Sequence, residues 1–326
     1  MVGSPDADTT RQEQYVSKSY LVTGGAGFIG SHLVDALLAA GHRVTVLDNF
    51  CSGKRENLAT ASDDLRAING DIRSIGNHAE GIGAVDGIIH LAALISGHDS
   101  LMHPEEYEDV NIRGLLRVIE YAEANAVRRI IFASSSTVYG NRDGLALTES
   151  VPPEPLTVYA LTKLTGEHLL RLYGDMHGFS HCSLRLFNVY GPRQATDHPY
   201  ANVTCKFSHA AANALPVKLF GDGNQSRDFV YVEDVVVAFM AVLDRSAERI
   251  YNVGTGRSAK INELIGELGS ISGKPLAAEH CPPWPNDIRS MQADTSRFVR
   301  EFGFAPKVSI REGLERTVEF FRGGRA

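Results

Sequence analysis

Short apolar runs alternate with helix-like segments in the first half of the chain. The runs read as strands over 20–23, 43–47, 65–69, 87–91 and 129–133. After the first run, apolar residues recur at helical spacing from Ile29 to Leu38, and Gly41 follows them as a helix-ending glycine would. A longer helical pattern fills 105–125. Strands that alternate with helices predict an α/β fold with a doubly wound parallel sheet.

The second half has a different texture from about Asn188 onward. Proline, glycine and aromatic residues become frequent, and the helical patterns shorten to 235–243 and 261–268. Near the end, Ser309 and Glu312 have the spacing of a capping box before an apolar helical pattern. We therefore expect a smaller second lobe, with some segments that return to the large sheet.

Composition narrows the function classes. The 326 residues are 43% hydrophobic and carry a formal net charge of −7 without a block of like charges, which disfavours a nucleic-acid partner. No apolar run reaches membrane-spanning length, and the polar first 18 residues lack the apolar segment of a signal peptide. Four cysteines without a C-x-x-C pair, and no H-E-x-x-H motif, predict a cytoplasmic protein without a metal site.

A glycine-rich turn follows the first predicted strand. In TGGAGFIG (23–30), Gly24, Gly27 and Gly30 stand between a strand and a helix. Glycines there let the backbone approach a pyrophosphate, and the helix offers free N–H groups to the anion. This context predicts dinucleotide binding.

Two aspartates follow later strands and bear on the identity of the dinucleotide. Asp48 ends the second strand, where a carboxylate accepts hydrogen bonds from ribose hydroxyls and repels a 2′-phosphate, so NAD is favoured over NADP. Asp71 follows the third strand, where it could touch adenine. The alternatives are that Asp48 merely begins a turn and that Asp71 is an ordinary loop residue.

Tyr159 and Lys163 form a Y-x-x-x-K pair that places both side chains on one helix face. A phenol has a pKa of ~10, so we expect the ammonium and an oxidised nicotinamide to lower the pKa of Tyr159 enough for proton transfer. Upstream, ASSSTVYG (133–140) puts hydroxyls at the carboxyl end of a strand, where ligands bind in such folds. These serines either assist Tyr159 or simply cap a turn.

From Ser19 onward, the chain resembles the extended short-chain dehydrogenases of the NAD-dependent epimerase/dehydratase family, and among them the UDP-sugar 4-epimerases. Besides the motifs above, the resemblance rests on Asn111, HLAA (90–93), RLFNVYGPR (185–193), GDGNQSRDFVYVEDV (221–235) and NVGTG (252–256). It implies a Rossmann-type NAD-binding domain over 19–187, to which segments around 228–255 return, and a substrate-binding lobe over 188–326. Residues 1–18 would be a mobile tail.

The resemblance also implies roles for individual residues. Ser135, Tyr159, Lys163 and Asn111 match the catalytic group, with Tyr159 as the base and Asn111 in support of the lysine. The expected NAD-binding residues are Gly24, Gly27, Phe28, Ile29, Gly30, Asp48, Asn49, Ser52, Gly53, Asp71, Ile72, Leu91, Ala92, Ala93, Tyr159 and Lys163. The expected substrate-binding residues are Ser96, Ser135, Ser136, Asn188, Lys218, Phe220, Arg227 and Arg289.

Within the substrate group, Asn188, Arg227 and Arg289 would hold the diphosphate of a nucleotide sugar, and Lys218 and Phe220 the uracil ring. Two plainer interpretations stand beside these: Phe220 as core, and Arg227 as a surface ion pair with Asp228.

The residues after Ser135 separate the reactions of this family. Dehydratases carry an acidic pair there and decarboxylases usually a glutamate, whereas this chain has Ser136 and Thr137, so C4 epimerisation through a 4-keto intermediate is favoured. Glucuronate epimerases tend to carry a threonine in place of Asn188 and an arginine in place of Ala195, so a neutral UDP-hexose is favoured. The alternatives are a UDP-glucuronate 4-epimerase, a 4,6-dehydratase, a 4-ketoreductase and, from another class, a non-catalytic dinucleotide sensor.

Two departures limit the choice of sugar. Trp284 replaces an arginine that contacts the diphosphate in many epimerases, and Met291 stands where family members gate the room for an N-acetyl group. Methionine is flexible and intermediate in size, so Met291 does not decide between the sugars. The resemblance further implies a homodimer formed through the 105–125 helix and the helix that carries Tyr159.

Overall fold

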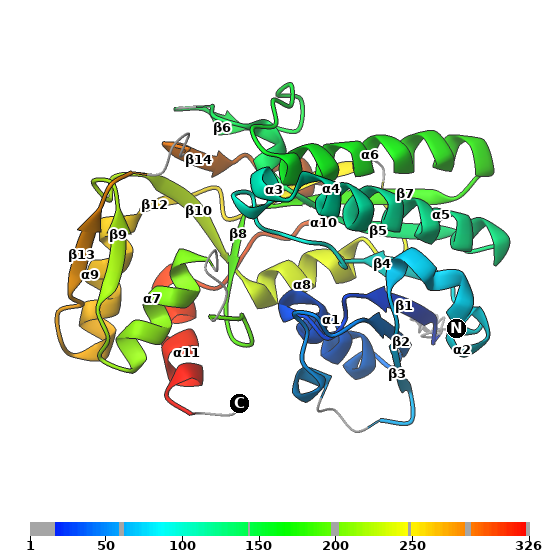
Figure 1. Ribbon diagram of the computed structural model, residues 1–326, viewed down its shortest axis with the longest axis horizontal. Helices are drawn as coiled ribbons and strands as arrows, with labels where there is room; N and C mark the ends of the chain where they lie inside the picture. Colours follow the sequence, from blue (N-terminus) through cyan, green and yellow to red (C-terminus); the bar gives the residue numbers. More distant parts are fainter. Residues whose placement is uncertain are drawn as a thin grey trace, which may run out of the picture.

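Seven parallel strands form the main sheet in a computed structural model of the protein (Figure 1). Their order is β11-β7-β5-β4-β1-β2-β3. The strands are β1 (Ser19–Thr23), β2 (Arg43–Asp48), β3 (Leu65–Asn69), β4 (Gly87–His90), β5 (Arg129–Ser135), β7 (Ser180–Leu186) and β11 (Ile250–Val253). The structure describes residues 17–58, 62–142, 144–196, 202–246, 249–283 and 288–323, so nearly all of the predicted tail and Trp284 lie outside the described residues.

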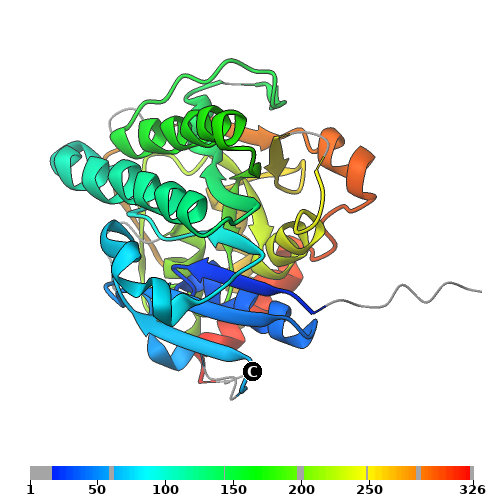
Figure 2. The same ribbon diagram turned by 90° about the vertical axis from the view of Figure 1, so that its right-hand side faces the viewer.

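Side chains of the sheet alternate between two helical layers. Tyr20 and Val22 of β1 pack in a core with α1 (Phe28–Ala39) and α8 (Val232–Ala241), whereas Leu21 packs in a second core with α5 (Gly114–Ala124) and α6 (Val158–His177). Figure 2 shows these helices on opposite sides of the sheet. The predicted α/β class with a doubly wound parallel sheet is confirmed.

The strand order reverses between β1 and β4. From β1 the chain moves outward to β2 and β3, and then returns to the other side of β1 to build β4, β5 and β7. In open α/β sheets such a reversal leaves a crevice at the carboxyl ends of the two strands, where ligands bind. The glycine turn follows β1, and residues 91–93 follow β4, so both predicted binding segments meet at this point.

A second set of elements lies beside the main sheet. A five-stranded sheet has the order β12-β10-β14-β6, with β8 paired to β10, and a two-stranded sheet joins β13 to β9. Their bounds are β6 (Ala146–Leu147), β8 (Asn188–Tyr190), β9 (Val217–Phe220), β10 (Ser226–Tyr231), β12 (Ser258–Lys260), β13 (Ala278–Cys281) and β14 (Ser290–Ala293). Helices α7 (Val203–Ala212), α9 (Ile261–Ser272) and α11 (Ile310–Phe321) pack together here, while α10 (Ser296–Phe302) reaches back to β11.

The remaining elements are short helices that connect the strands. They are η1 (Arg55–Leu58), η2 (Ile72–His78), α2 (Ala79–Ile82), α3 (Asp99–Met102), α4 (Pro104–Tyr107), η3 (Glu108–Arg113) and η4 (Ser136–Tyr139). Within the described ranges, no helix combines the length and apolar character needed to cross a bilayer.

The helix predicted over 105–125 is interrupted. Its middle, η3, is a π-helical turn between α4 and α5, and Asn111 lies within that turn. A π turn inserts extra backbone into the helix and is frequent at functional sites. The apolar pattern predicted the helix correctly but carried no signal of this insertion. At the other end of the chain, the N-cap half of the predicted capping box is confirmed, because the Ser309 hydroxyl accepts a hydrogen bond from the Glu312 N–H at 3.2 Å.

A buried ion pair fastens α6 to the sheet. Arg185 of β7 donates to both carboxylate oxygens of Glu167, at 2.9 and 2.7 Å, and the Ser134 hydroxyl donates to the same carboxylate at 2.5 Å. The Arg185 guanidinium also lies 4.8 Å from the centre of the Tyr139 ring. These contacts join the end of β5 to the helix that carries Tyr159 and Lys163.

Candidate active site

The glycine turn is closely packed. A side chain at Gly24 would bring its Cβ within 2.7 Å of the Ala92 N–H nitrogen, and one at Gly30 would lie 2.2 Å from the Gly24 carbonyl oxygen. Gly24 also has a φ of +71°, in the left-handed region. Gly27 is the N-cap residue of α1 and supplies no side-chain cap, so the first N–H groups of the helix keep their capacity for an anion. A pyrophosphate therefore fits this cradle.

Asp48 ends β2 beside the turn and is 7% exposed. Its carboxylate accepts hydrogen bonds from the Ala26 N–H at 2.9 Å and the Phe50 N–H at 2.8 Å. A side chain at Gly53 would approach Asp48 Oδ2 to 3.0 Å. Asp48 thus does cap a turn, but a carboxylate has about four acceptor positions, so it can also receive ribose hydroxyls.

The ends of β2 and β3 meet where adenine is expected. Asn49 donates to Asp71 at 3.2 Å, and Arg73 lowers the pKa of the Asp71 carboxyl to about 2 through hydrogen bonds and its charge. The side chain of Ile72 is buried in the core under α5, so only its backbone is placed to touch a ligand. Leu91, Ala92 and Ala93 follow β4, and the backbone of Leu91 and Ala92 lies against Gly24.

Lys163 ties the Tyr159 helix to the end of β5. Its ammonium donates to the Ala133 carbonyl at 2.8 Å and lies 4.9 Å from the centre of the Phe132 ring and 5.9 Å from that of Tyr159. The side chain is almost fully buried, and burial lowers the pKa of Lys163 to about 7 because it penalises the charged form.

Burial also raises the pKa of the Tyr159 phenol, while a hydrogen bond from Ser135 acts in the opposite direction. The protein groups therefore do not produce the lowered pKa of Tyr159 that the sequence led us to expect. The physical reason is that desolvation of the phenol outweighs the hydrogen bond from Ser135. Burial also lowers the pKa of Lys163 to about 7, so near pH 7 this lysine has lost part of the positive charge that was expected to lower the pKa of Tyr159.

Ser135 occupies both roles that the sequence left open. It caps η4, because its Oγ accepts from the Thr137 N–H at 3.2 Å, and it also stands close enough to Tyr159 to hydrogen bond with it. The Thr137 hydroxyl donates to the same Oγ at 2.9 Å. Ser136 is buried next to them.

Asn111 bonds the loop after β4 and α6. Its amide bonds the backbone of Leu94 in both directions, at 2.8 and 3.0 Å, and donates to the Thr162 hydroxyl at 3.0 Å. Lys163 instead contacts the Ala133 carbonyl and the rings of Phe132 and Tyr159. Asn111 thus braces the loop after β4 against α6, and the role of Thr162 was missed although it lies inside the Y-x-x-x-K segment.

The loop after β4 also reaches the start of α6. The Ser96 hydroxyl accepts from the Asp99 N–H at 3.0 Å, and the Ser96 N–H donates to the Tyr107 hydroxyl at 3.0 Å. Ser100 accepts from the Tyr159 N–H at 3.0 Å. Sequence reasoning missed Ser100, because nothing in the local pattern links it to a helix 59 positions away.

The predicted substrate residues of the second lobe come from neighbouring strands. Asn188 on β8 is paired in register with Phe229 of β10, and Arg227 of β10 is paired with the buried Met291 of β14. Lys218 and Phe220 lie on β9.

Two aspartates of the second lobe bear on the roles expected of Arg289 and Arg227. Arg289 forms a bidentate pair with Asp222, at 3.0 and 3.1 Å. Asp228 is fully buried and accepts from Thr255, Gly256 and Ala293, which contradicts a surface ion pair with Arg227.

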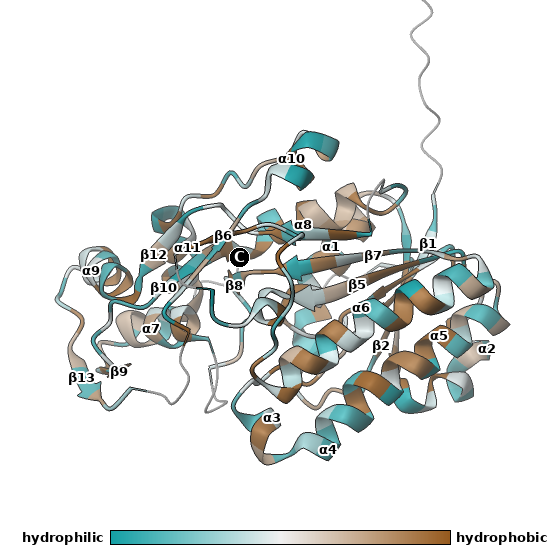
Figure 3. Cartoon of the chain, turned by 90° about the horizontal axis from the view of Figure 1, so that it is seen from above, coloured by the Kyte–Doolittle hydropathy of each residue, from teal (hydrophilic) through white to brown (hydrophobic). Residues whose placement is uncertain are grey.

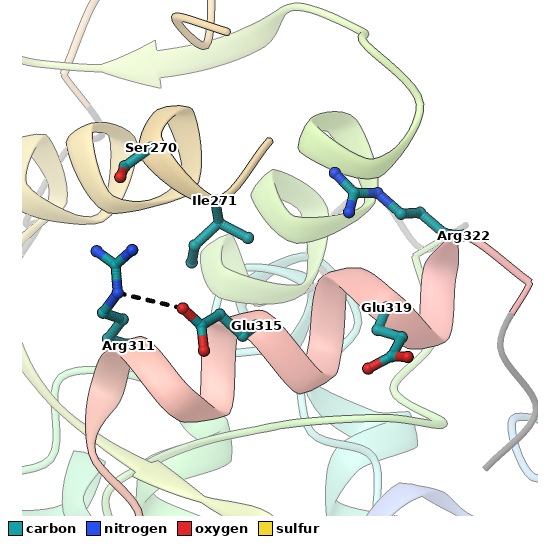
Figure 4. Close-up of a pocket in the computed structure, with 6 residues that line it drawn as sticks. All are labelled: Ser270, Ile271, Arg311, Glu315, Glu319 and Arg322. Carbon is teal, nitrogen blue, oxygen red and sulfur yellow. Dashed lines mark ion pairs between the residues drawn. The ribbon is translucent and has the colours of Figure 1, made fainter. Parts of the chain in front are cut away.

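Two surface pockets elsewhere on the molecule do not contain the candidate catalytic residues. One, of about 620 Å³, lies between α9 and α11 and is lined by exposed groups such as Arg311 and Glu315 (Figure 4). Another, of about 360 Å³, runs along α6 and is lined by Arg171, Arg185 and His181 among others. Neither is lined by Ser135, Tyr159 or Lys163, so the site is identified by its chemistry and by the strand reversal rather than by cavity size.

Comparison with known proteins agrees with this geometry. Residues 20–254 match the model of the NAD dependent epimerase/dehydratase family. The chain is 39% identical over 309 residues to UDP-glucose 4-epimerase of Mycolicibacterium smegmatis, covering 93% of this chain and 98% of that protein.

Two solved structures superpose closely on the chain. The Thermus thermophilus UDP-glucose 4-epimerase, in complex with NAD, has a TM-score of 0.88 at 37% identity, covering 94% of this chain and 99% of that one. The UDP-N-acetylglucosamine 4-epimerase of Methanobrevibacter ruminantium, with UDP-N-acetylmuramic acid, has a TM-score of 0.89 at 35% identity, covering 94% and 98%.

Gly30→Ala tests the glycine cradle. Because the added Cβ would collide with the Gly24 carbonyl, we expect a loss of about 2 kcal/mol or more in the free energy of unfolding and of most NAD affinity. Gly266→Ala, in α9 with open space around it, should instead stabilise by about 0.5–1 kcal/mol. Urea unfolding and NAD titration measure both, and an unchanged Gly30→Ala protein would contradict the assignment.

Lys163→Met tests the buried ammonium. Between pH 7 and its ordinary pKa of 10.5, the unfolded chain holds a proton on Lys163 that the folded chain has lost. Wild-type stability should therefore rise relative to Lys163→Met, by about 1.4 kcal/mol per pH unit at most, as the pH increases from 7 to 9. Urea unfolding of nucleotide-free protein measures this, and a difference independent of pH would show that Lys163 keeps its ordinary pKa.

Proposed function

The chain belongs to the NAD-dependent epimerase/dehydratase family, and we propose that it inverts the configuration at C4 of a UDP-hexose, with UDP-glucose and UDP-galactose as the interconverted pair. One observation carries the proposal: Ser135, Tyr159 and Lys163 stand together at the carboxyl end of β5, next to a turn shaped for a dinucleotide. The names of the relatives at 37–39% identity support the sugar.

NAD would be held by the glycine turn through its pyrophosphate and by Asp48 through its adenosine ribose, and when bound it supplies a reversible hydride acceptor for C4 of the sugar. The residues of this chain manage the proton. Burial raises the pKa of Tyr159, and the positive charge of an oxidised nicotinamide would oppose that effect and favour the phenolate. As phenolate, Tyr159 accepts the proton of the 4-hydroxyl, and Ser135 donates a hydrogen bond to the same oxygen. Lys163, anchored on Ala133, holds the helix turn that presents Tyr159.

Inversion requires the flat 4-keto sugar to show its other face. Tyr159 then returns the proton to the 4-oxygen, so the phenol acts as base and acid in turn. No second acid or base is needed at the neighbouring carbons, which agrees with Ser136 and Thr137 in place of an acidic pair. Asn188 and Ala195 provide no cation for a uronate, which supports a neutral sugar.

A homodimer stays a prediction. Apolar side chains that are exposed on α3 and α6, namely Leu101, Met102, Leu161, Leu172 and Met176, would give a second copy an apolar surface. Figure 3 shows α6 and α5 side by side on this face of the molecule. Sedimentation equilibrium would distinguish the dimer from a monomer.

The proposed activity is tested with purified protein and a panel of UDP-glucose, UDP-galactose, their N-acetyl analogues and UDP-glucuronate. We expect conversion of the neutral hexoses without added reductant, and a loss of at least about 100-fold for Tyr159→Phe and Ser135→Ala. Tyr173→Phe, the same change on the same helix outside the site, is the matched control. Conversion of none of the sugars, even with NAD supplied, would refute the proposal, and conversion of the glucuronate alone would refute the neutral sugar.

A further inference from the structure

The hydroxyl oxygen of Ser135 accepts two hydrogen bonds, and both come from Thr137. Thr137 approaches Ser135 Oγ twice, through its backbone N–H at 3.2 Å and through its hydroxyl at 2.9 Å. A serine oxygen has two acceptor lone pairs and one proton to donate. Both lone pairs are therefore occupied, and the remaining capacity of Ser135 is donation.

We propose that Thr137 is a positioning residue for the epimerase reaction: its hydroxyl fixes Ser135 as a hydrogen-bond donor, which donates to Tyr159 before the sugar binds and to the reacting oxygen once the sugar is bound. This inference rests on the proposed function for its catalytic meaning. A hydroxyl that accepts one hydrogen bond donates a stronger one, so the chain Thr137–Ser135–Tyr159 favours the phenolate. Donation suits both stages of the reaction, because the 4-oxygen is an alkoxide-like acceptor in one and a carbonyl in the other.

The short helix that carries Thr137 is held from several sides. Val138 and Tyr139 are fully buried, the Tyr139 hydroxyl donates to Asn252 at 2.6 Å, and the Val138 carbonyl accepts from the Glu154 N–H at 2.9 Å. The Arg185 guanidinium lies against the Tyr139 ring. Thr137 therefore keeps its place beside Ser135 without support from its own hydroxyl, and that hydroxyl can be removed separately from the backbone contact.

Thr137→Val tests the proposal, since it removes the hydroxyl and keeps the branched shape. Thr137→Ser restores a hydroxyl, Thr137→Ala removes it without an added methyl group should valine disturb folding, and Thr148→Val repeats the change at a hydroxyl pair outside the site. The first measurement is the titration of Tyr159 in NAD-bound protein labelled with ¹³C-tyrosine, assigned with Tyr159→Phe.

Thr137→Val and Thr137→Ala should raise the pKa of Tyr159 by about 0.5–1 unit, and Thr137→Ser should return it to the wild-type value. The kcat for C4 inversion should fall about fivefold to tenfold with little change in KM, and its rise with pH should move to higher pH. An unchanged titration in Thr137→Val and Thr137→Ala would overturn the inference. The titration needs no substrate, so it decides this point even if the wild-type protein converts no sugar.

Discussion

The hydrogen bond from the buried Lys163 ammonium to the Ala133 carbonyl is the contact on which the site depends. It joins α6, which carries Tyr159, to the end of β5, which carries Ser135. Burying an ammonium is costly unless its charge is compensated, and the carbonyl and the two aromatic rings beside Lys163 compensate it only in part. The low pKa of Lys163 follows from that burial. The same enclosure strengthens every other polar contact around Tyr159.

A second layer of contacts keeps this arrangement rigid. The Glu167–Arg185 pair fastens α6 to β7 and receives Ser134, the neighbour of Ser135. Asn111 connects the loop after β4 with Thr162 one turn from Tyr159. The segment after β4 lies against the glycine turn at the strand reversal between β1 and β4, and Asn111 bonds that segment to the helix of Tyr159. The expected dinucleotide site and the candidate catalytic residues are thus held in fixed positions relative to each other.

Patterns that are local in the chain were predictable. The five strands of the first half, the glycine turn and the cap at Ser309 follow from spacing and residue type alone. Contacts between distant segments were not. The π turn at Asn111, the pairing of β11 with β7 and the contact of Ser100 with Tyr159 depend on packing across many residues. The sequence shows the lysine beside Tyr159 but not the burial of both groups, which raises the pKa of Tyr159 and lowers that of Lys163.

In the proposed reaction one hydrogen leaves C4 and the same hydrogen returns, while the side chains of Ser135 and Tyr159 handle only the proton on oxygen. The most direct measurement uses a UDP-hexose with deuterium at C4, converted by the purified protein in ordinary water and followed by mass spectrometry and NMR. We expect the C4 epimer to keep its deuterium, since carbon-bound hydrogen never reaches a solvent-exchangeable group. Loss of the label to water during conversion would contradict it.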